Sequence, residues 1–151
     1  MDVVHTANRR GTFFYWGGDG VNGATAGEVT RKTTLREELT ARRKLMAPEL
    51  IDTRGLKVQA RFLATHFCAR ARTVALYAPI RGEVPTRDIL SAALADGKIV
   101  CYPLSHVHGR ILSFRAISSE SELEPGRLGV REPTSAAELI PVEQIELFAV
   151  P

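Results

Sequence analysis

Apolar positions become periodic after residue 30, with the spacing of an α-helix. In "TRKTTLREELTARRKLM" they form one stripe, which consists of Leu35, Leu39 and Met46, with Leu45 beside it. Thr34 and Glu37 fit a capping box, so we predict a helix that begins near Lys32.

A second helical pattern runs through "APELIDTRGLKVQARFLATHFCARA", with Pro48 near the first turn. Its apolar stripe is expected to consist of Leu56, Ala60, Leu63 and Phe67. Gly55 is a candidate break between two helical pieces, because glycine is a poor helix former.

A strand–helix–strand pattern follows. The runs "TVALYAPI" (73–80) and "KIVCYPL" (98–104) are short and continuously apolar, as in strands buried on both faces. Between them "PTRDILSAALADG" predicts a helix, with Thr86 as N-cap and Gly97 as C-terminal stop. Such a unit predicts parallel pairing through a right-handed crossover.

The rest of the chain adds strands around this unit. "ILSFRAI" (111–117) reads as a third strand in a hairpin-like relation to the second. "SSESELEPGRLGVREPTS" reads as a polar connection rich in Pro and Gly, and "IELFAVP" as one more buried strand. The pattern as a whole predicts the α/β class.

Composition is that of an ordinary globular protein, with 151 residues, 44% hydrophobic and 25% charged. No apolar run approaches the ~20 residues of a membrane span. The block "FFYW" is too short for a secretory signal, so we predict a cytoplasmic protein without membrane association. Residues 1–29 predict a flexible extension, since their glycines match no phosphate-loop motif, and 30–151 one domain.

Charge is uneven along the chain. Residues 1–75 carry 13 Lys and Arg against 7 Asp and Glu. Lys32, Arg36 and Arg43 share one side of the first predicted helix, where they suit either solvation or contact with phosphates.

Cysteine and histidine give little chemistry. Cys68 and Cys101 form no CxxC pair and are expected to be buried, reduced thiols. His106 and His108 point the same way if extended, but two histidines are a weak metal signal, and we predict no metal site in the chain.

The turn "RGEVP" lies between a predicted buried strand and a helix N-terminus. Ligands of open α/β sheets bind outside the carboxyl ends of the strands, and helix N-termini favour anions. Glu83 can therefore face a ligand donor there, or instead form a surface pair with Arg81.

Five segments in order resemble the 5-formyltetrahydrofolate cyclo-ligase (methenyltetrahydrofolate synthetase) family. They are "KTTLREELTARRKL", "ALYAPIRGEVPTRDILSAALADGKIVCYP", "LSFR", "LEPGRLGVREP" and "IELFAVP". The resemblance covers residues 30–151 and implies a three-layer α/β sheet of the type shared with ribose-phosphate isomerases and CoA transferases. It also implies ATP- and Mg²⁺-dependent conversion of 5-formyltetrahydrofolate to 5,10-methenyltetrahydrofolate, as part of one-carbon folate metabolism.

The resemblance also implies site residues. Lys32 and Arg36 match the Lys and Arg that contact ATP phosphates in the family. Glu83 matches a folate-contacting glutamate, Ala78 falls at a folate-lining position, and Arg115 occupies the place of the family's arginine, which we predict to contact substrate. It implies no nucleic-acid partner.

The family continues past "VP" with G-x-x-F-D and then a Gly-rich G-x-R-x-G-x-G-x-G-Y-Y-D segment, which this sequence does not contain. We therefore expect a domain incomplete at the C-terminus, with an open edge and uncovered apolar surface. The family is monomeric, and such a surface favours oligomerisation here. A non-catalytic nucleotide- or RNA-binding paralogue, or an inactive fragment, is the alternative function.

Overall fold

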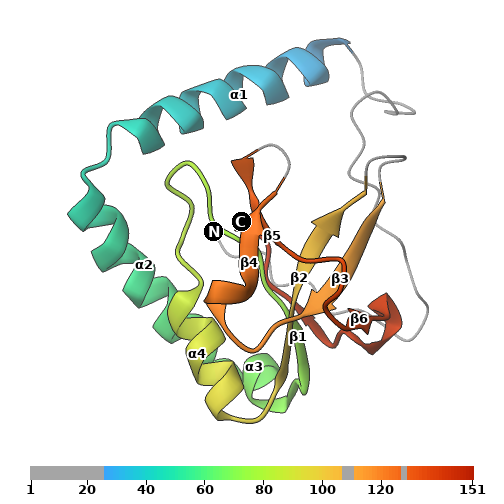
Figure 1. Cartoon of the computed structure of the whole chain (residues 1–151). Helices are drawn as coiled ribbons and strands as arrows, with labels where there is room; N and C mark the ends of the chain where they lie inside the picture. Colours follow the sequence, from blue (N-terminus) through green and yellow to red (C-terminus); the bar gives the residue numbers. More distant parts are fainter. Residues whose placement is uncertain (1–25, 107–110, 127–128) are drawn as a thin grey trace.

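A computed structural model describes residues 26–106, 111–126 and 129–151 (Figure 1). The helices of this part are α1 (Ala26–Lys44), α2 (Pro48–Leu63), α3 (His66–Arg70) and α4 (Arg87–Ala95). The strands are β1 (Thr73–Ala75), β2 (Ile99–Ser105), β3 (Leu112–Ala116), β4 (Leu123–Pro125), β5 (Arg131–Pro133), β6 (Leu139–Ile140) and β7 (Leu147–Phe148). In the described residues, no helix is long and apolar enough to cross a membrane.

The main sheet confirms the predicted α/β class and topology. Its strand order is β6-β3-β2-β1-β7, and α4 connects the parallel pair β1 and β2. β7 also runs parallel to β1, whereas β3 is antiparallel to both β2 and β6. Because β1, β2 and β7 point the same way, their carboxyl ends lie at one edge of the sheet.

The helices α2, α3 and α4 gather on one side of the sheet, and α1 extends across one end of the molecule (Figure 1). The larger core cluster includes Val74, Leu90, Val100, Tyr102 and Leu147. A smaller one joins Ala75, Cys101, Ile140 and Ile145. Successive residues of β1 and β2 belong to different clusters: Val74 and Val100 to the larger, Ala75 and Cys101 to the smaller. This alternation is expected for a sheet that is packed on both faces.

Both cysteines are buried and free, as predicted. Burial raises the pKa of the Cys101 thiol to about 12 and also raises the pKa of Cys68. Burial and a raised pKa both disfavour the thiolate, which is the reactive form of cysteine.

The start of α1 was wrongly predicted. The helix begins at Ala26, not near Lys32, so residues 26–29 of the predicted extension are helical, while residues 1–25 lie outside the described part. Thr34 lies within the helix, where its Oγ1 donates to the Thr30 carbonyl at 3.1 Å instead of capping.

The packed side of α2 also differs from the prediction. The helix is continuous through Gly55, and it ends at Leu63, ahead of the N-cap Thr65 of α3. Leu56 and Phe67 of the predicted apolar stripe are exposed, whereas Gly55 and Gln59 are buried. The side-chain amide oxygen of Gln59 accepts a hydrogen bond from the Asp88 backbone at 2.9 Å, so a polar contact joins α2 to α4.

The segment predicted as a connection contains a small hairpin. β4 and β5 pair antiparallel as a separate two-stranded sheet. Nη2 of Arg131 donates to the carbonyls of Glu120 and Leu123 at 3.1 and 2.6 Å. Side-chain contacts of this kind stabilise a hairpin whose sequence has few strand-forming residues.

α1 is poorly covered in the described structure. From Thr30 to Lys44 every residue except Thr40 is exposed. Leu35 and Leu39 of the predicted apolar stripe are 53% and 44% exposed. The periodicity predicted a helix here correctly, and the side of α1 that carries Leu35 and Leu39 is open among the described residues.

Candidate functional site

The segment after β1 forms a tight turn at the carboxyl edge of the parallel strands. Arg81 and Gly82 both have positive φ, at 51° and 73°. The Glu83 backbone N–H donates to the Ile80 carbonyl at 3.0 Å. Two central residues with positive φ and this hydrogen bond define a type I′ turn. Arg81 is a non-glycine residue in the left-handed region, which costs free energy.

Glu83 also closes this turn with its side chain. Oε2 accepts a hydrogen bond from the Ile80 backbone N–H at 3.0 Å. Oε1 lies 4.0 Å from Nη1 of Arg43, near the end of α1. The Glu83 side chain is 18% exposed, so its carboxylate is held in one orientation and still reaches solvent.

A hydrogen-bonded cluster lies beneath the turn. The Tyr77 hydroxyl donates to the Val84 carbonyl at 2.9 Å, and Oγ1 of Thr86 donates to the Tyr77 carbonyl at 3.0 Å. Burial, and then the negative charge of Glu83, raise the pKa of Tyr77 to about 12, while the charge of Arg43 lowers it. These hydrogen bonds connect the segment before the turn to the segment after it, and so they stabilise the turn.

Thr86 was predicted to cap α4, and it does precede the helix, but its side chain makes no capping bond. Its hydroxyl is engaged by Tyr77 and lies 3.5 Å from the Tyr102 hydroxyl. Gly97 follows the end of α4 with φ of 71°, as predicted for a C-terminal stop.

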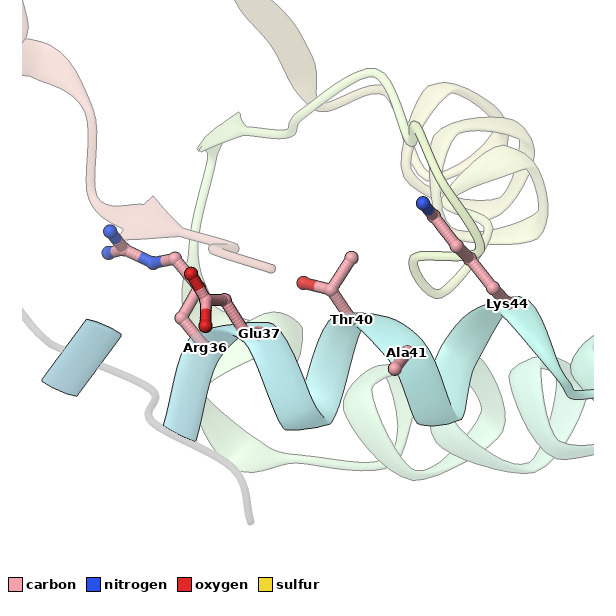
Figure 2. Close-up of a pocket in the computed structure, with 5 residues that line it drawn as sticks. All are labelled: Arg36, Glu37, Thr40, Ala41 and Lys44. Atoms are coloured by element: carbon pink, nitrogen blue, oxygen red, sulfur yellow. The ribbon is translucent and has the colours of Figure 1, made fainter. Parts of the chain in front are cut away.

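Lys32 and Arg36 lie on α1, and both are exposed. An open recess of about 370 Å³ borders the helix and is lined by Arg36, Glu37, Thr40, Ala41 and Lys44. Figure 2 shows Arg36, Thr40 and Lys44 projecting from the same side of α1. Arg43 lies seven residues after Arg36, hence on a neighbouring part of the helix surface. The recess thus borders the basic side predicted from the sequence.

Ala78 and Arg115 have different surroundings. The Ala78 side chain is 7% exposed and belongs to the larger core cluster, so it offers a ligand little beyond its backbone. Arg115 lies on β3 opposite Tyr102, and its Nη1 donates to the Ala137 carbonyl at 2.9 Å. Nε of Arg115 is buried without a hydrogen-bond partner among the described residues. The structure therefore connects Arg115 to the segment before β6, and not to the Glu83 turn.

Two polar residues near this edge were not predicted as site residues. Arg43 was named only as part of the basic helix side, although it is the residue that faces Glu83. Glu132 on β5 is buried, and its Oε1 accepts from the Ser105 hydroxyl at 2.6 Å at the end of β2. The sequence signal for Glu132 is its place in "GVREP", within the segment "LEPGRLGVREP" that carries part of the family resemblance.

Metal ligands do not gather in the part of the chain that the structure describes. No three His, Cys, Asp or Glu side chains approach one another there closely enough to hold an ion. Nε2 of His106 lies 2.9 Å from the Ser113 hydroxyl, and His108 lies outside the described residues.

A second open recess, of about 470 Å³, lies at the opposite edge, where β1 and β2 begin. Its basic lining includes Arg70, Arg72 and Lys98. Nζ of Lys98 donates to the carbonyls of Ala71 and Ala69 at 2.9 and 3.4 Å, so this amine closes the α3–β1 connection. The recess lies at the amino ends of the strands, away from the edge where ligands of such sheets bind.

A sequence model described as the 5-formyltetrahydrofolate cyclo-ligase family matches residues 28–151. The chain belongs to this family. The match includes α1 from its first turn onward, the Glu83 turn and the β4–β5 hairpin.

Relatives support the same membership. The 5-formyltetrahydrofolate cyclo-ligases of two Escherichia coli strains, K12 and O157:H7, are each 26% identical over 113 residues, which is 73% of this chain. The NMR structure of Aquifex aeolicus 5,10-methenyltetrahydrofolate synthetase matches with a TM-score of 0.69 and 28% identity over 80% of the chain. This chain spans 62% of the length of the E. coli relatives and 60% of the A. aeolicus protein.

Proposed function

We propose that this cyclo-ligase family member acts in the ATP-driven conversion of 5-formyltetrahydrofolate to 5,10-methenyltetrahydrofolate. One observation carries the proposal: a carboxylate that suits a folate and a basic helix side that suits a triphosphate lie next to each other. Arg43 of α1 lies 4.0 Å from Glu83, and Arg36 lies on the same side of that helix.

Glu83 is suited to the pterin ring of a folate, which carries a ring N–H beside an amino group. A fixed carboxylate accepts hydrogen bonds from such donors, and charge-assisted bonds of this type are the stronger ones. The turn holds the carboxylate through Oε2 and the Ile80 backbone N–H, so little rotational freedom is lost when a ligand binds.

Lys32 and Arg36 are suited to the phosphates of ATP. In the proposed reaction the formyl oxygen attacks the γ-phosphorus, the bond to ADP breaks, and a phosphorylated iminium forms. N10 then attacks the formyl carbon and loses its proton, the C–O bond breaks, and inorganic phosphate leaves. The two cations would orient the triphosphate and neutralise charge that develops during the transfer.

Magnesium enters this proposal as part of the substrate Mg·ATP. The described residues contain no cluster of three His, Cys, Asp or Glu side chains. They therefore do not form a metal site in which protein groups alone supply the ligands. Mg²⁺ is commonly held by phosphate oxygens and water with one or two carboxylates, so the triphosphate would supply the first ligands.

The exposed basic side of α1 also suits a second function, non-catalytic binding of nucleotides or RNA. The absorbance band of 5,10-methenyltetrahydrofolate separates the two. The chain is mixed with 5-formyltetrahydrofolate and Mg·ATP, with a non-hydrolysable ATP analogue as the control. ATP-dependent growth of the band supports the ligase. A flat trace from folded protein that still binds the analogue or RNA overturns the ligase for this chain and supports the binding function.

A further inference from the structure

Arg43 joins α1 to the Glu83 turn by two kinds of contact. Its guanidinium faces the carboxylate at 4.0 Å, with the Arg43 side chain 45% exposed. Its Cβ and its backbone carbonyl lie near the turn as well, because a β-carbon placed on Gly82 would lie 3.9 Å from each of these two atoms. The same β-carbon would lie 3.5 Å from Cδ1 of Ile51 on α2. The turn therefore packs into the corner between the end of α1 and the start of α2.

The rest of α1 has few means of fixing its direction. Thr40 is the one residue between Thr30 and Lys44 that the described structure does not leave exposed, and no residue of that range belongs to either core cluster. Contacts at the end of a helix with little other burial have a large influence on where its far end lies. Lys32 and Arg36 are nearer that far end, on the side that Arg43 shares.

Glu83 divides its carboxylate between two partners. Oε2 is occupied by the Ile80 N–H, so Oε1 is the oxygen that meets either Arg43 or an incoming ligand donor. A donor that takes Oε1 competes with Arg43. Once displaced, the guanidinium is an unpaired cation on the basic side of α1, where it adds to the attraction for phosphate.

We propose that Arg43 is a positioning residue that sets the placement of α1 against the Glu83 turn in the ligand-free protein, and that its release from Glu83 by folate couples the two ligand sites. The coupling rests on the proposed function, since it assumes that folate binds at Glu83 and nucleotide at Lys32 and Arg36. Binding at one site then strengthens binding at the other by the same factor. An exposed ion pair is weak, so the expected factor is about two- to fivefold.

The positioning role is tested without ligands. Hydrogen exchange is measured for α1 and for the Ile80 amide in the wild type and in Arg43→Gln. Arg42→Gln is the matched control. Arg42 is also exposed in the last turn of α1, and its substitution removes the same charge at a position that has no ion pair with Glu83 among the described residues. Arg43→Gln should exchange several-fold faster in these segments while the sheet is unchanged. Equal exchange in the two variants overturns the proposal.

The coupling is tested by the dissociation constant of a non-hydrolysable ATP analogue, measured by calorimetry with and without saturating 5-formyltetrahydrofolate. Folate should lower the dissociation constant of the analogue two- to fivefold in the wild type and in Arg42→Gln. It should leave that constant unchanged in Arg43→Gln. A factor that survives in Arg43→Gln overturns the coupling. If neither ligand binds the wild type, the proposed function fails, and the exchange result still decides the positioning role.

Discussion

Gly55 of α2 lies directly against the ring of Pro85. A β-carbon at Gly55 would come 2.7 Å from Cδ and 3.4 Å from Cγ of that proline. Pro85 stands just before α4, in the loop that carries Glu83. The close approach therefore fixes the distance between α2 and the base of the candidate site, and it explains why a glycine is kept in the interior of a helix.

The contact predicts an unusual sign for Gly55→Ala. An exposed helical glycine changed to alanine normally stabilises a protein by up to about 1 kcal/mol. Here the added methyl group meets a rigid ring, and overpacking of this kind costs about 1–3 kcal/mol. Urea unfolding should therefore show destabilisation by Gly55→Ala. In a Pro85→Ala background the loss should shrink or reverse, and an equal loss in both backgrounds would show that the ring is not the cause.

The Arg81–Gly82 turn predicts a stabilising substitution. Asparagine tolerates positive φ better than arginine, and Asn-Gly is a preferred pair for a type I′ turn. Arg81→Asn should raise the free energy of unfolding by roughly 0.5–1 kcal/mol. Arg81→Ala is the control, because it removes the same side chain but keeps a β-carbon without a compensating polar group. Similar stability of both variants in urea would exclude relief of backbone strain as the cause.

The topology around the site followed from local signals. The apolar runs 73–80 and 98–104, with Thr86 and Gly97 at the two ends of the intervening helix, were enough to predict that β1, α4 and β2 exist and in which order. The extent of β1 was wrong, because the strand is Thr73–Ala75 and the rest of the run 73–80 is not strand. These elements are short-range units whose boundaries are marked by turn and capping residues. The Gly-Glu turn at their carboxyl edge could be placed for the same reason, from strand order and helix start alone.

Contacts between distant segments could not be predicted in this way. Helical spacing put Arg43 on the basic side of α1, but its partner Glu83 is 40 positions away. The β4–β5 hairpin depends on Arg131 and on the Glu132–Ser105 hydrogen bond, whereas its own sequence has the Pro and Gly content of a loop. The wrong prediction of a helix break at Gly55 has the same origin. The ring of Pro85, which leaves room only for a glycine there, belongs to a segment that is distant in the sequence.

The raised pKa of Tyr77 predicts a loss of stability at alkaline pH. Its pKa is raised from 10 in the unfolded chain to about 12 in the folded protein. Between these values the unfolded state releases a proton that the folded state keeps. The contribution of Tyr77 to the free energy of unfolding is therefore fully present below pH 10 and is lost as the pH rises to 12. Tyr77→Phe should remove this part of the pH dependence.

The same substitution breaks the hydrogen bond to the Val84 carbonyl, at a cost of about 1 kcal/mol at neutral pH. Urea unfolding of both proteins between pH 7 and 11 gives the comparison. Cys101 is present in both and contributes equally, so the difference between the curves belongs to Tyr77. Parallel curves up to pH 11 would contradict the assignment.

Arg115 predicts a structural effect rather than a direct effect on substrate. Arg115→Met removes the hydrogen bond from Nη1 to the Ala137 carbonyl and replaces a partly buried guanidinium by an apolar chain. Loss of a charged hydrogen bond costs about 1.5–3 kcal/mol, so the melting temperature should fall. Binding of 5-formyltetrahydrofolate, measured below that temperature, should be unchanged. Weaker folate binding at full stability would instead support the substrate contact implied by the family resemblance.

Glu83→Gln separates charge from shape at the candidate site. Glutamine keeps an oxygen that can accept from the Ile80 N–H, so the turn and the fold should persist. It lacks the negative charge that would strengthen hydrogen bonds from a folate, so the dissociation constant for 5-formyltetrahydrofolate should rise roughly 10- to 100-fold. Fluorescence or calorimetric titration measures this without requiring turnover. Glu120→Gln is the control, because Glu120 pairs with Arg87 and Arg131 and has no contact with the Glu83 turn among the described residues. Equal affinities for the wild type and Glu83→Gln would remove Glu83 from the folate site and leave it as a turn-closing residue only.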